Sequence, residues 1–245
     1  MPTRLAPLLL LFALAATPAG AQSSQYEECV DLAAQDPAAA REKAAQWEAV
    51  GGGGEAQHCA AVALVALGAE KEAAKLLTEL GVEATNLPIE DRAAALNLAG
   101  ELWLRNGQGL LARETFLRAG QLSPNDRAPL LGAAKAAAAI EDWNAARDSL
   151  TRALELNPSD GEALTLRAAA YRLMGETSNA LDDAVKATRL APEAAIAWFE
   201  RGAAERALGS KAAAQEAWLR ASILDPDGPA GELARTNLQL LAVEE

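Results

Sequence analysis

Apolar residues recur along most of the chain with the spacing of an α-helix. Small and large apolar residues stand at i, i+4 and i+7, which places them on one face of a helix. This pattern predicts a final helix over residues 229–243 and, before it, four helix pairs over 88–106 with 109–122, 127–139 with 142–156, 161–174 with 177–190, and 195–208 with 211–224. No stretch shows the alternation expected of a strand. We therefore predict an all-α fold.

Four prolines follow these helix pairs at intervals of 34 residues: Pro124, Pro158, Pro192 and Pro226. An alanine five positions before each proline and a leucine two positions before it repeat in the same register. A fixed period of this length is typical of stacked helical hairpins. The repeat predicts an α-solenoid of antiparallel helix hairpins, with capping helices at its N- and C-terminal ends.

The repeated residues resemble the tetratricopeptide repeat family. The first helix of the first regular unit carries a large, a small and an aromatic residue at the family's spacing, as Leu96, Gly100 and Trp103. In the second helix of each unit, Ala, a large residue and Ala take the same spacing: Ala112, Phe116, Ala119; Ala146, Leu150, Ala153; Ala180, Ala184, Ala187; and Ala214, Trp218, Ala221. Small residues permit close approach of the helices. The resemblance implies a solenoid over residues 55–226.

Some positions depart from the family pattern. Glycine recurs at the turn within a hairpin as Gly107, Gly175 and Gly209, where a helix end can adopt a left-handed conformation. Glu141 takes this place in the second regular unit. Other departures are Ala137 and Glu205 in place of the aromatic residue, and Ala184 in place of the large one. They loosen single units without breaking the register.

The pattern divides the chain into eight segments. We expect a signal peptide over 1–21, a tail and a capping helix pair over 22–54, with 22–25 disordered, and a divergent repeat over 55–87. Regular repeats follow over 88–126, 127–160, 161–194 and 195–228, and a C-terminal capping helix over 229–245. The glycine run 51–54 is interpreted as a turn between helices, because no Gly-Lys-Ser/Thr follows it as in a phosphate-binding loop.

The first 21 residues are typical of a secretory signal. Arg4 is their only charge, residues 8–16 are apolar, and small residues lead to a cleavage site after Ala21. The apolar run is too short to span a bilayer comfortably. We predict an exported chain, in the simplest case in a bacterial periplasm, with no membrane span after cleavage.

Acidic residues exceed basic ones. The formal net charge of −12 becomes −13 when Arg4 is removed with the signal peptide. An acidic surface repels phosphates and favours basic partners, so nucleic acid is excluded as a partner.

The chain has two cysteines, Cys29 and Cys59. An oxidising compartment favours a disulfide between them. Redox chemistry would call for a Cys-x-x-Cys spacing, and a zinc site would need more ligands than these thiols and His58. We therefore predict a structural disulfide and neither a metal site nor a cofactor.

No catalytic residues are assigned. His58 is the only histidine, and no Gly-x-Ser-x-Gly motif accompanies it. Carboxylates could in principle form a glycosidase pair, but on a solenoid they are generally solvated charges. We interpret Arg167 with Asp183 as a half-buried ion pair within a hairpin.

The resemblance implies recognition of a protein or peptide in a concave groove lined by the first helices. The candidate groove residues stand one turn from the packing stripe: Asn97, Glu101, Leu104, Leu131, Lys135, Thr165, Arg172, Phe199 and Arg206. Lys135, Arg172 and Arg206 could receive a carboxylate or be ordinary solvated cations. Some family members bind a chaperone's C-terminal carboxylate with Lys and Asn. Here Asn97 and Glu101 occupy those places, and Glu101 would repel that ligand.

Three hypotheses follow for the function. The first is a non-catalytic adaptor or scaffold that binds another protein of the bacterial cell envelope. The second is a chaperone-like holder of extended peptides in the periplasm. An enzyme is the remote third.

Overall fold

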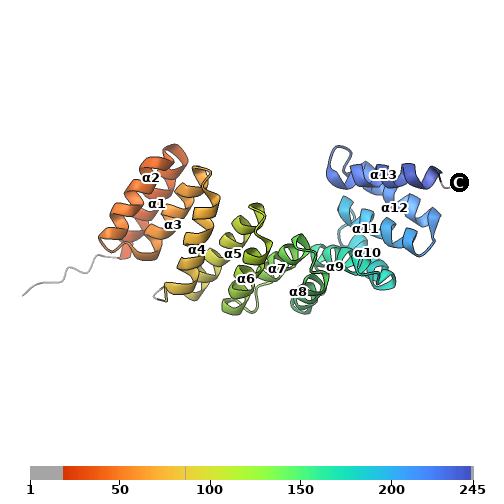
Figure 1. Cartoon of the computed structure of the whole chain (residues 1–245), viewed down its shortest axis with the longest axis horizontal. Helices are drawn as coiled ribbons and strands as arrows, with labels where there is room; N and C mark the ends of the chain where they lie inside the picture. The colour runs from red at the N-terminus through yellow and green to blue at the C-terminus, as the bar shows by residue number, and fades with distance from the viewer. Residues whose placement is uncertain (1–18, 86, 244–245) are drawn as a thin grey trace, which may run out of the picture. The chain divides into compact units, whose positions relative to one another are not determined.

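The computed structural model describes residues 19–85 and 87–243. These residues form thirteen α-helices and contain no strand (Figure 1), so the all-α prediction is confirmed. The chain divides into two compact units. Unit 1 ends at Leu67, and unit 2 begins at Gly68.

Unit 1 contains three helices, α1 (Ala19–Gln35), α2 (Pro37–Ala49) and α3 (Gly53–Ala66). Each packs against the other two. Asp36 caps α2 by accepting a hydrogen bond from the backbone N–H of Ala39 at 3.0 Å, which satisfies a donor that the helix leaves unpaired. A disulfide between the fully buried Cys29 and Cys59 joins α1 to α3, as predicted.

Three expectations concern the N-terminal part of the chain. The disordered tail expected over residues 22–25 is wrong, because these residues belong to α1. None of them is a proline or glycine, so nothing local stops the helix there. The signal peptide expected over 1–21 lies outside the described residues except for its last three and stays a prediction. The repeat expected over 55–87 also stays a prediction, and the division between units 1 and 2 falls within it.

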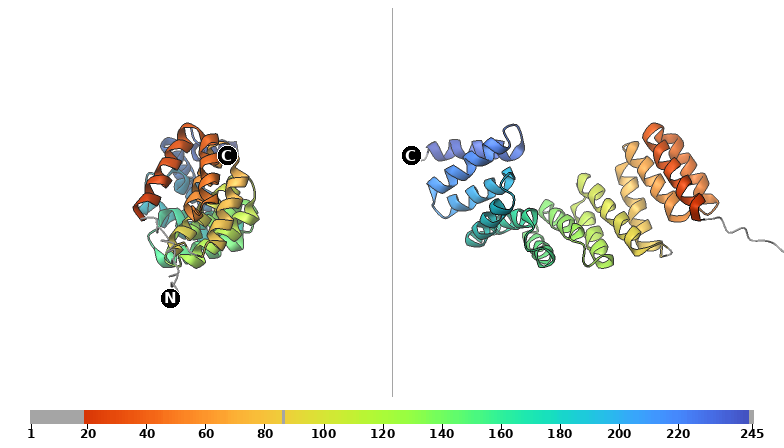
Figure 2. Two further views of the ribbon diagram at one scale, coloured as in Figure 1. Left: turned by 90° about the vertical axis from the view of Figure 1, so that its left-hand side faces the viewer. Right: turned by 180° about the vertical axis from the view of Figure 1, so that it is seen from behind.

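Unit 2 is a succession of ten helices, each of which packs against the next (Figures 1 and 2). They are α4 (Glu70–Glu83), α5 (Ile89–Arg105), α6 (Gly109–Leu122), α7 (Ala128–Ala139), α8 (Trp143–Leu156), α9 (Gly161–Leu173), α10 (Thr177–Leu190), α11 (Ala195–Ala207), α12 (Lys211–Leu224) and α13 (Pro229–Val243). From α5 onward the helix ends lie within two residues of those predicted from the sequence.

The turns inside the hairpins repeat in backbone geometry. The N–H of Gln108, Asp142, Glu176 and Ser210 each donates to the carbonyl five residues earlier, which ends the first helix of each hairpin. The preceding residue has positive φ in each turn: 71° at Gly107, 58° at Glu141, 80° at Gly175 and 86° at Gly209. The left-handed turn expected from the glycines is confirmed, and Glu141 adopts it without being glycine.

Close approach of the helices depends on glycine. A Cβ added at Gly100 would lie 2.8 Å from the ring of Phe116, and one at Gly202 would lie 2.5 Å from the indole of Trp218. Both pairs occupy the same places in their repeats. A large residue of the second helix therefore fills the space beside a glycine of the first.

One ion pair repeats in the 34-residue register. Arg113 of α6 contacts Asp142 at 2.6 Å, and Arg147 of α8 approaches Glu176 to 3.9 Å. In both cases the acid belongs to the turn of the next hairpin. These ion pairs link each hairpin to the next one.

Candidate functional site

The odd-numbered helices of unit 2 form an inner layer. α5 contacts α7, α9 contacts α11, and α11 contacts α13, although another helix separates each pair along the chain. No two even-numbered helices of unit 2 make a comparable contact among the described residues. Helices that approach their second neighbours lie on the inside of a curved stack. We call α5, α7, α9 and α11 the inner helices and the even-numbered ones the outer helices.

A cavity of about 630 Å³ opens between the inner helices α5, α7 and α9. We call it the groove cavity. Five predicted groove residues line it: Asn97, Glu101, Leu104, Leu131 and Lys135. Further lining comes from Phe116, Asp126, Arg127, Ala128, Gly132 and Glu162. The volume lies in the range of sites that hold small ligands or side chains.

Asn97 has an unsatisfied acceptor at the groove cavity. Its Oδ1 is buried and has no hydrogen-bond partner among the described residues. An unpaired buried oxygen costs about 1 to 3 kcal/mol. Asn97 is thus a lining residue of the groove cavity whose side-chain oxygen is not satisfied within the described part of the chain.

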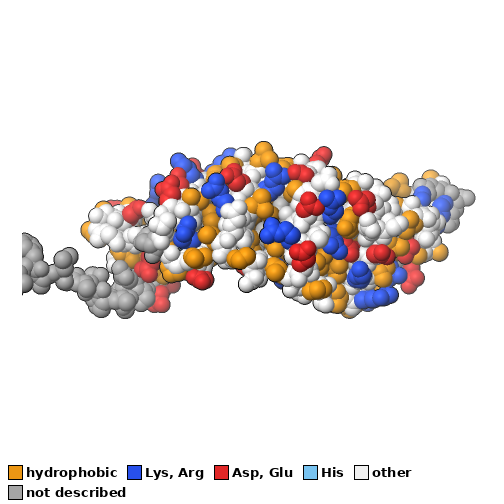
Figure 3. Space-filling model, turned by 90° about the horizontal axis from the view of Figure 1, so that it is seen from below, with side chains coloured by type: hydrophobic (Ala, Val, Ile, Leu, Met, Phe, Trp, Pro, Cys, Tyr) orange, Lys and Arg blue, Asp and Glu red, His pale blue; other side chains and the backbone are white. Residues whose placement is uncertain are grey.

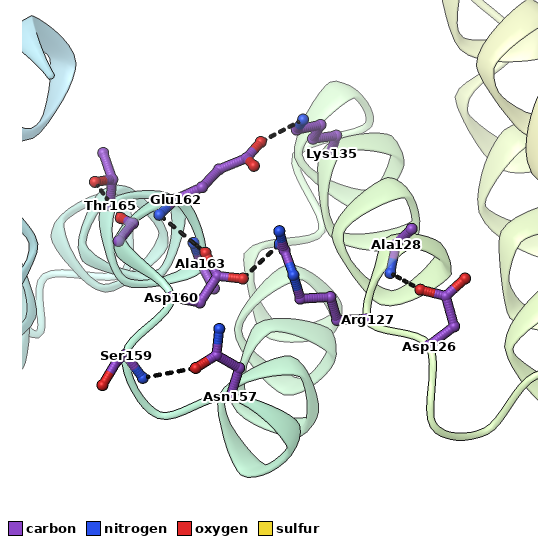
Figure 4. Close-up of polar contacts among 11 residues, drawn as sticks. Asp126, Arg127, Ala128, Lys135, Asn157, Ser159, Asp160, Glu162, Ala163 and Thr165 are labelled. Atoms are coloured by element: carbon purple, nitrogen blue, oxygen red, sulfur yellow. Dashed lines mark hydrogen bonds and ion pairs between the residues drawn. The ribbon is translucent and has the colours of Figure 1, made fainter. Parts of the chain in front are cut away.

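The cations at the groove cavity are already paired. Lys135 of α7 contacts Glu162 of α9 at 2.7 Å, and Arg127 contacts Asp160 at 2.5 Å. Figure 4 shows both basic side chains pointing from α7 toward the start of α9. Asp160 also caps α9 by accepting from the backbone N–H of Glu162 and Ala163. Its carboxylate therefore has three donors.

Arg172 is paired in the same way one repeat later. Its Nε and Nη2 donate to the two carboxylate oxygens of Glu200 on α11, at 2.7 and 3.1 Å. These hydrogen bonds raise the pKa of Arg172 above its ordinary value, although burial acts in the opposite direction. Glu200 is 5% exposed. A carboxylate from outside would have to displace it.

The remaining predicted groove residues differ in exposure. Thr165 is 5% exposed and its hydroxyl donates to the carbonyl of Gly161, while Phe199 is 8% exposed and packs in a cluster with Trp218. Both side chains are thus largely committed to packing within unit 2. Arg206 is half-buried on α11.

Sequence reasoning missed several lining residues and the pairing of the cations. The missed signal is a basic residue on one inner helix followed by an acidic residue 27 or 28 positions later, as in Lys135 with Glu162 and Arg172 with Glu200. The described surface seen in Figure 3 likewise mixes positive, negative and hydrophobic side chains.

His58 of unit 1 is engaged with Tyr26. The Tyr26 hydroxyl lies 2.8 Å from His58 Nδ1, and the two rings are 5.7 Å apart. The described part of the chain contains no group of three or more His, Cys, Asp or Glu side chains placed to hold a metal ion. Within it, no helix combines the length and apolar character needed to cross a membrane.

Comparison with solved structures shows the fold. The C-terminal part of a tetratricopeptide repeat-containing protein from Cytophaga hutchinsonii superposes with a TM-score of 0.65 at 16% identity, covering 88% of this chain and 95% of that one. MamA from Desulfovibrio magneticus RS-1 gives 0.61 at 19% identity, covering 71% and 97%. YrrB, described as a tetratricopeptide repeat protein with an unusual peptide-binding site, gives 0.59 at 20% identity, covering 75% and 91%. No family model and no curated protein matches the sequence.

Proposed function

We propose that this chain, which has the tetratricopeptide repeat fold, is a non-catalytic adaptor that binds a segment of a partner protein in the groove cavity. The observation that carries the proposal is the buried, unpaired Oδ1 of Asn97 at a cavity between three inner helices. Such an acceptor suits a backbone N–H of an extended segment. The peptide-binding site named for YrrB, whose fold is similar, is in keeping with this role.

The groove cavity favours a segment without acidic side chains. Lys135 and Arg127 are neutralised by Glu162 and Asp160, and the exposed Glu101 adds a negative charge. Leu104 and Leu131 supply apolar lining. The segment therefore donates a backbone N–H to Asn97 and places an apolar side chain against these leucines. Its flanking residues are neutral or basic.

We further propose that the adaptor acts in the bacterial cell envelope. Two features support this location: the signal peptide expected over 1–21, and the disulfide between Cys29 and Cys59, which suits an oxidising compartment. The chain would then act as a scaffold for another envelope protein.

Site-directed photocrosslinking in a cell envelope fraction tests the binding surface. A benzophenone amino acid replaces Glu101, which lines the groove cavity, and in a matched variant replaces Glu155, which is exposed on outer helix α8. We expect one dominant adduct from position 101 and none from position 155. Adducts from position 155 alone would refute the groove. Many different adducts from position 101 would instead support the chaperone-like holder of peptides.

A substitution tests the role of Asn97. Asn97→Ala removes the acceptor without breaking a hydrogen bond of Oδ1 in the free protein. The crosslinked adduct should therefore decrease about tenfold, since a hydrogen bond to a buried group contributes about 1 to 1.5 kcal/mol. Asn144→Ala, at an exposed position of α8, is the matched control and should leave the adduct unchanged. An undiminished adduct with Asn97→Ala would exclude Asn97 as the anchor.

A further inference from the structure

Arg167 and Arg201 occupy the same place in consecutive repeats but have different surroundings. Arg167 of α9 donates from Nε and Nη2 to the carboxylate of Asp183 on α10, at 2.6 and 3.0 Å. Its Nη1 donates to the Thr151 hydroxyl on α8 at 3.2 Å. All three nitrogens of this guanidinium therefore have acceptors on outer helices.

Arg201 of α11 lacks both acceptors. Moving 34 residues along the chain, Ala217 stands where Asp183 stood and Val185 where Thr151 stood. The Nε of Arg201 is buried and unpaired. Other partly buried cations do have acceptors: hydrogen bonds to oxygens of the described residues are made by Lys43, Arg92, Arg113, Arg147 and Arg172.

The guanidinium of Arg201 is oriented by an aromatic ring, but its Nε has no acceptor. It lies over the ring of Trp198, 5.4 Å from the centroid, which orients a cation without supplying an acceptor. Trp198 is itself fixed, because its indole N–H donates to the carbonyl of Pro192 at 2.9 Å. Of the three guanidinium nitrogens only Nε is enclosed without a partner, so the terminal nitrogens remain open to solvent.

An arginine in this state suits a carboxylate. The planar guanidinium offers two parallel N–H donors that match the two carboxylate oxygens, as the Arg167 pair demonstrates one repeat earlier. Ala217 has a methyl group where that repeat has a carboxymethyl group, so this position supplies no anion to Arg201. We propose that Arg201 is a receptor for a carboxylate supplied from outside the chain, which binds to its solvent-accessible terminal nitrogens.

This site is independent of the groove cavity. The groove cavity is lined by residues of α5, α6, α7 and α9 and of the turn before α7, and Arg201 of α11 is not among them. A partner with an acidic side chain would therefore meet the adaptor at a second surface. The groove cavity, in contrast, disfavours acidic segments.

Nuclear magnetic resonance of the arginine side chains tests the proposal on the full chain. The Nε–Hε signal of Arg201 is assigned from its loss in Arg201→Gln, with Arg189→Gln at an exposed position of α10 as control. The probes are the peptides acetyl-Gly-Asp-Gly-amide and acetyl-Gly-Asn-Gly-amide, and acetate ion. We expect a saturable shift of the Arg201 signal with the Asp peptide and none with the Asn peptide. Equal shifts with both peptides would overturn the proposal.

A second variant separates binding from folding. Ala217→Asp supplies the missing carboxylate from within the chain and should weaken binding of the Asp peptide at least about tenfold. Gln215→Asp adds the same charge at an exposed position of α12 and should leave binding unchanged. Undiminished binding by Ala217→Asp would also overturn the proposal. If acetate shifts the signal as strongly as the Asp peptide, the ligand is a small carboxylate; if only the peptide does, it is an acidic protein segment.

Discussion

Arg167 and Asp183 form a two-point ion pair across the hairpin of α9 and α10, with Nε–Oδ2 and Nη2–Oδ1 distances of 2.6 and 3.0 Å. Asp183 is 3% exposed. Burial by itself lowers the pKa of Arg167, and the hydrogen bonds and charge of Asp183 more than offset it, so the pKa lies above its ordinary value. The ion pair expected from the sequence is thus confirmed. The negative charge of the buried Asp183 balances the positive charge of Arg167.

Removing the acid of this pair should destabilise unit 2. Asp183→Ala leaves the Arg167 guanidinium enclosed without its carboxylate, and we expect the free energy of unfolding in urea to fall by about 3 kcal/mol. Glu114→Ala breaks the exposed pair with Arg118 on α6 and should cost less than about 0.5 kcal/mol. Equal costs for the two variants would contradict the assigned role of burial.

Asp142 should make stability depend on pH. Its hydrogen bond from the Ala145 backbone N–H lowers its pKa, burial opposes this, and Arg113 lowers it further. Since the folded pKa lies below the unfolded value, the stabilisation is present above about pH 4 and is lost as the pH falls through the folded pKa. Asp142→Ala should cost about 1 kcal/mol at pH 7 and progressively less below pH 4. Urea unfolding at several pH values measures this, with the exposed Asp182→Ala as a neutral control.

Glu141 is a position where glycine should stabilise the protein. Its φ of 58° lies in the left-handed region that costs a residue with a side chain about 1 to 2 kcal/mol. Glycine at this position would avoid that cost, but its greater conformational freedom in the unfolded chain offsets part of the gain in stability. We expect Glu141→Gly to raise the free energy of unfolding by about 0.5 to 1 kcal/mol. Glu155→Gly, within α8, should lower it by a similar amount; a loss at both sites would show that φ at Glu141 carries no strain.

Gly202 should not tolerate a methyl group. An added Cβ would lie 2.5 Å from the Trp218 indole, so Gly202→Ala should cost about 1 to 3 kcal/mol by thermal or urea unfolding. Gly120→Ala is the matched control, because the nearest atom to its Cβ is 3.6 Å away and alanine is the better helix former. The pairing with Trp218 is tested further by Gly202→Ala with Trp218→Leu, which should recover part of the loss.

The disulfide should determine the stability of unit 1. It closes a loop with a sequence separation of 30 residues, for which loop-closure entropy gives about 3 to 4 kcal/mol. Replacing both cysteines with alanine should speed amide hydrogen exchange in α1, α2 and α3 by two orders of magnitude or more. Unchanged exchange there would show that the bond adds no stability. Replacement of the exposed Val50 by alanine provides the control.

The regular helices could be predicted because their signals are local. The small residue beside a large one, the left-handed turn and the proline after each hairpin all act within one repeat, and they gave α5 to α13 within two residues of their observed ends. Residues 22–25 were missed because glutamine and serine give no apolar pattern, although nothing in this stretch stops a helix. The candidate groove residues were chosen by helical spacing, which does not report whether a side chain such as Phe199 is drawn into a packing cluster.

The sequence was sufficient to predict the period, the helix pairs, the turn positions and the pairing of the two cysteines, because each follows from short-range backbone preferences or from the lack of an alternative partner. Which polar groups remain without a hydrogen-bond partner depends on the packing of the helices. Lys135 and Arg172 find acids on the next inner helix, whereas Asn97 and Arg201 keep a buried atom without a partner. The reason is physical: a charge is neutralised by groups from neighbouring repeats, and their distances depend on how the helices stack.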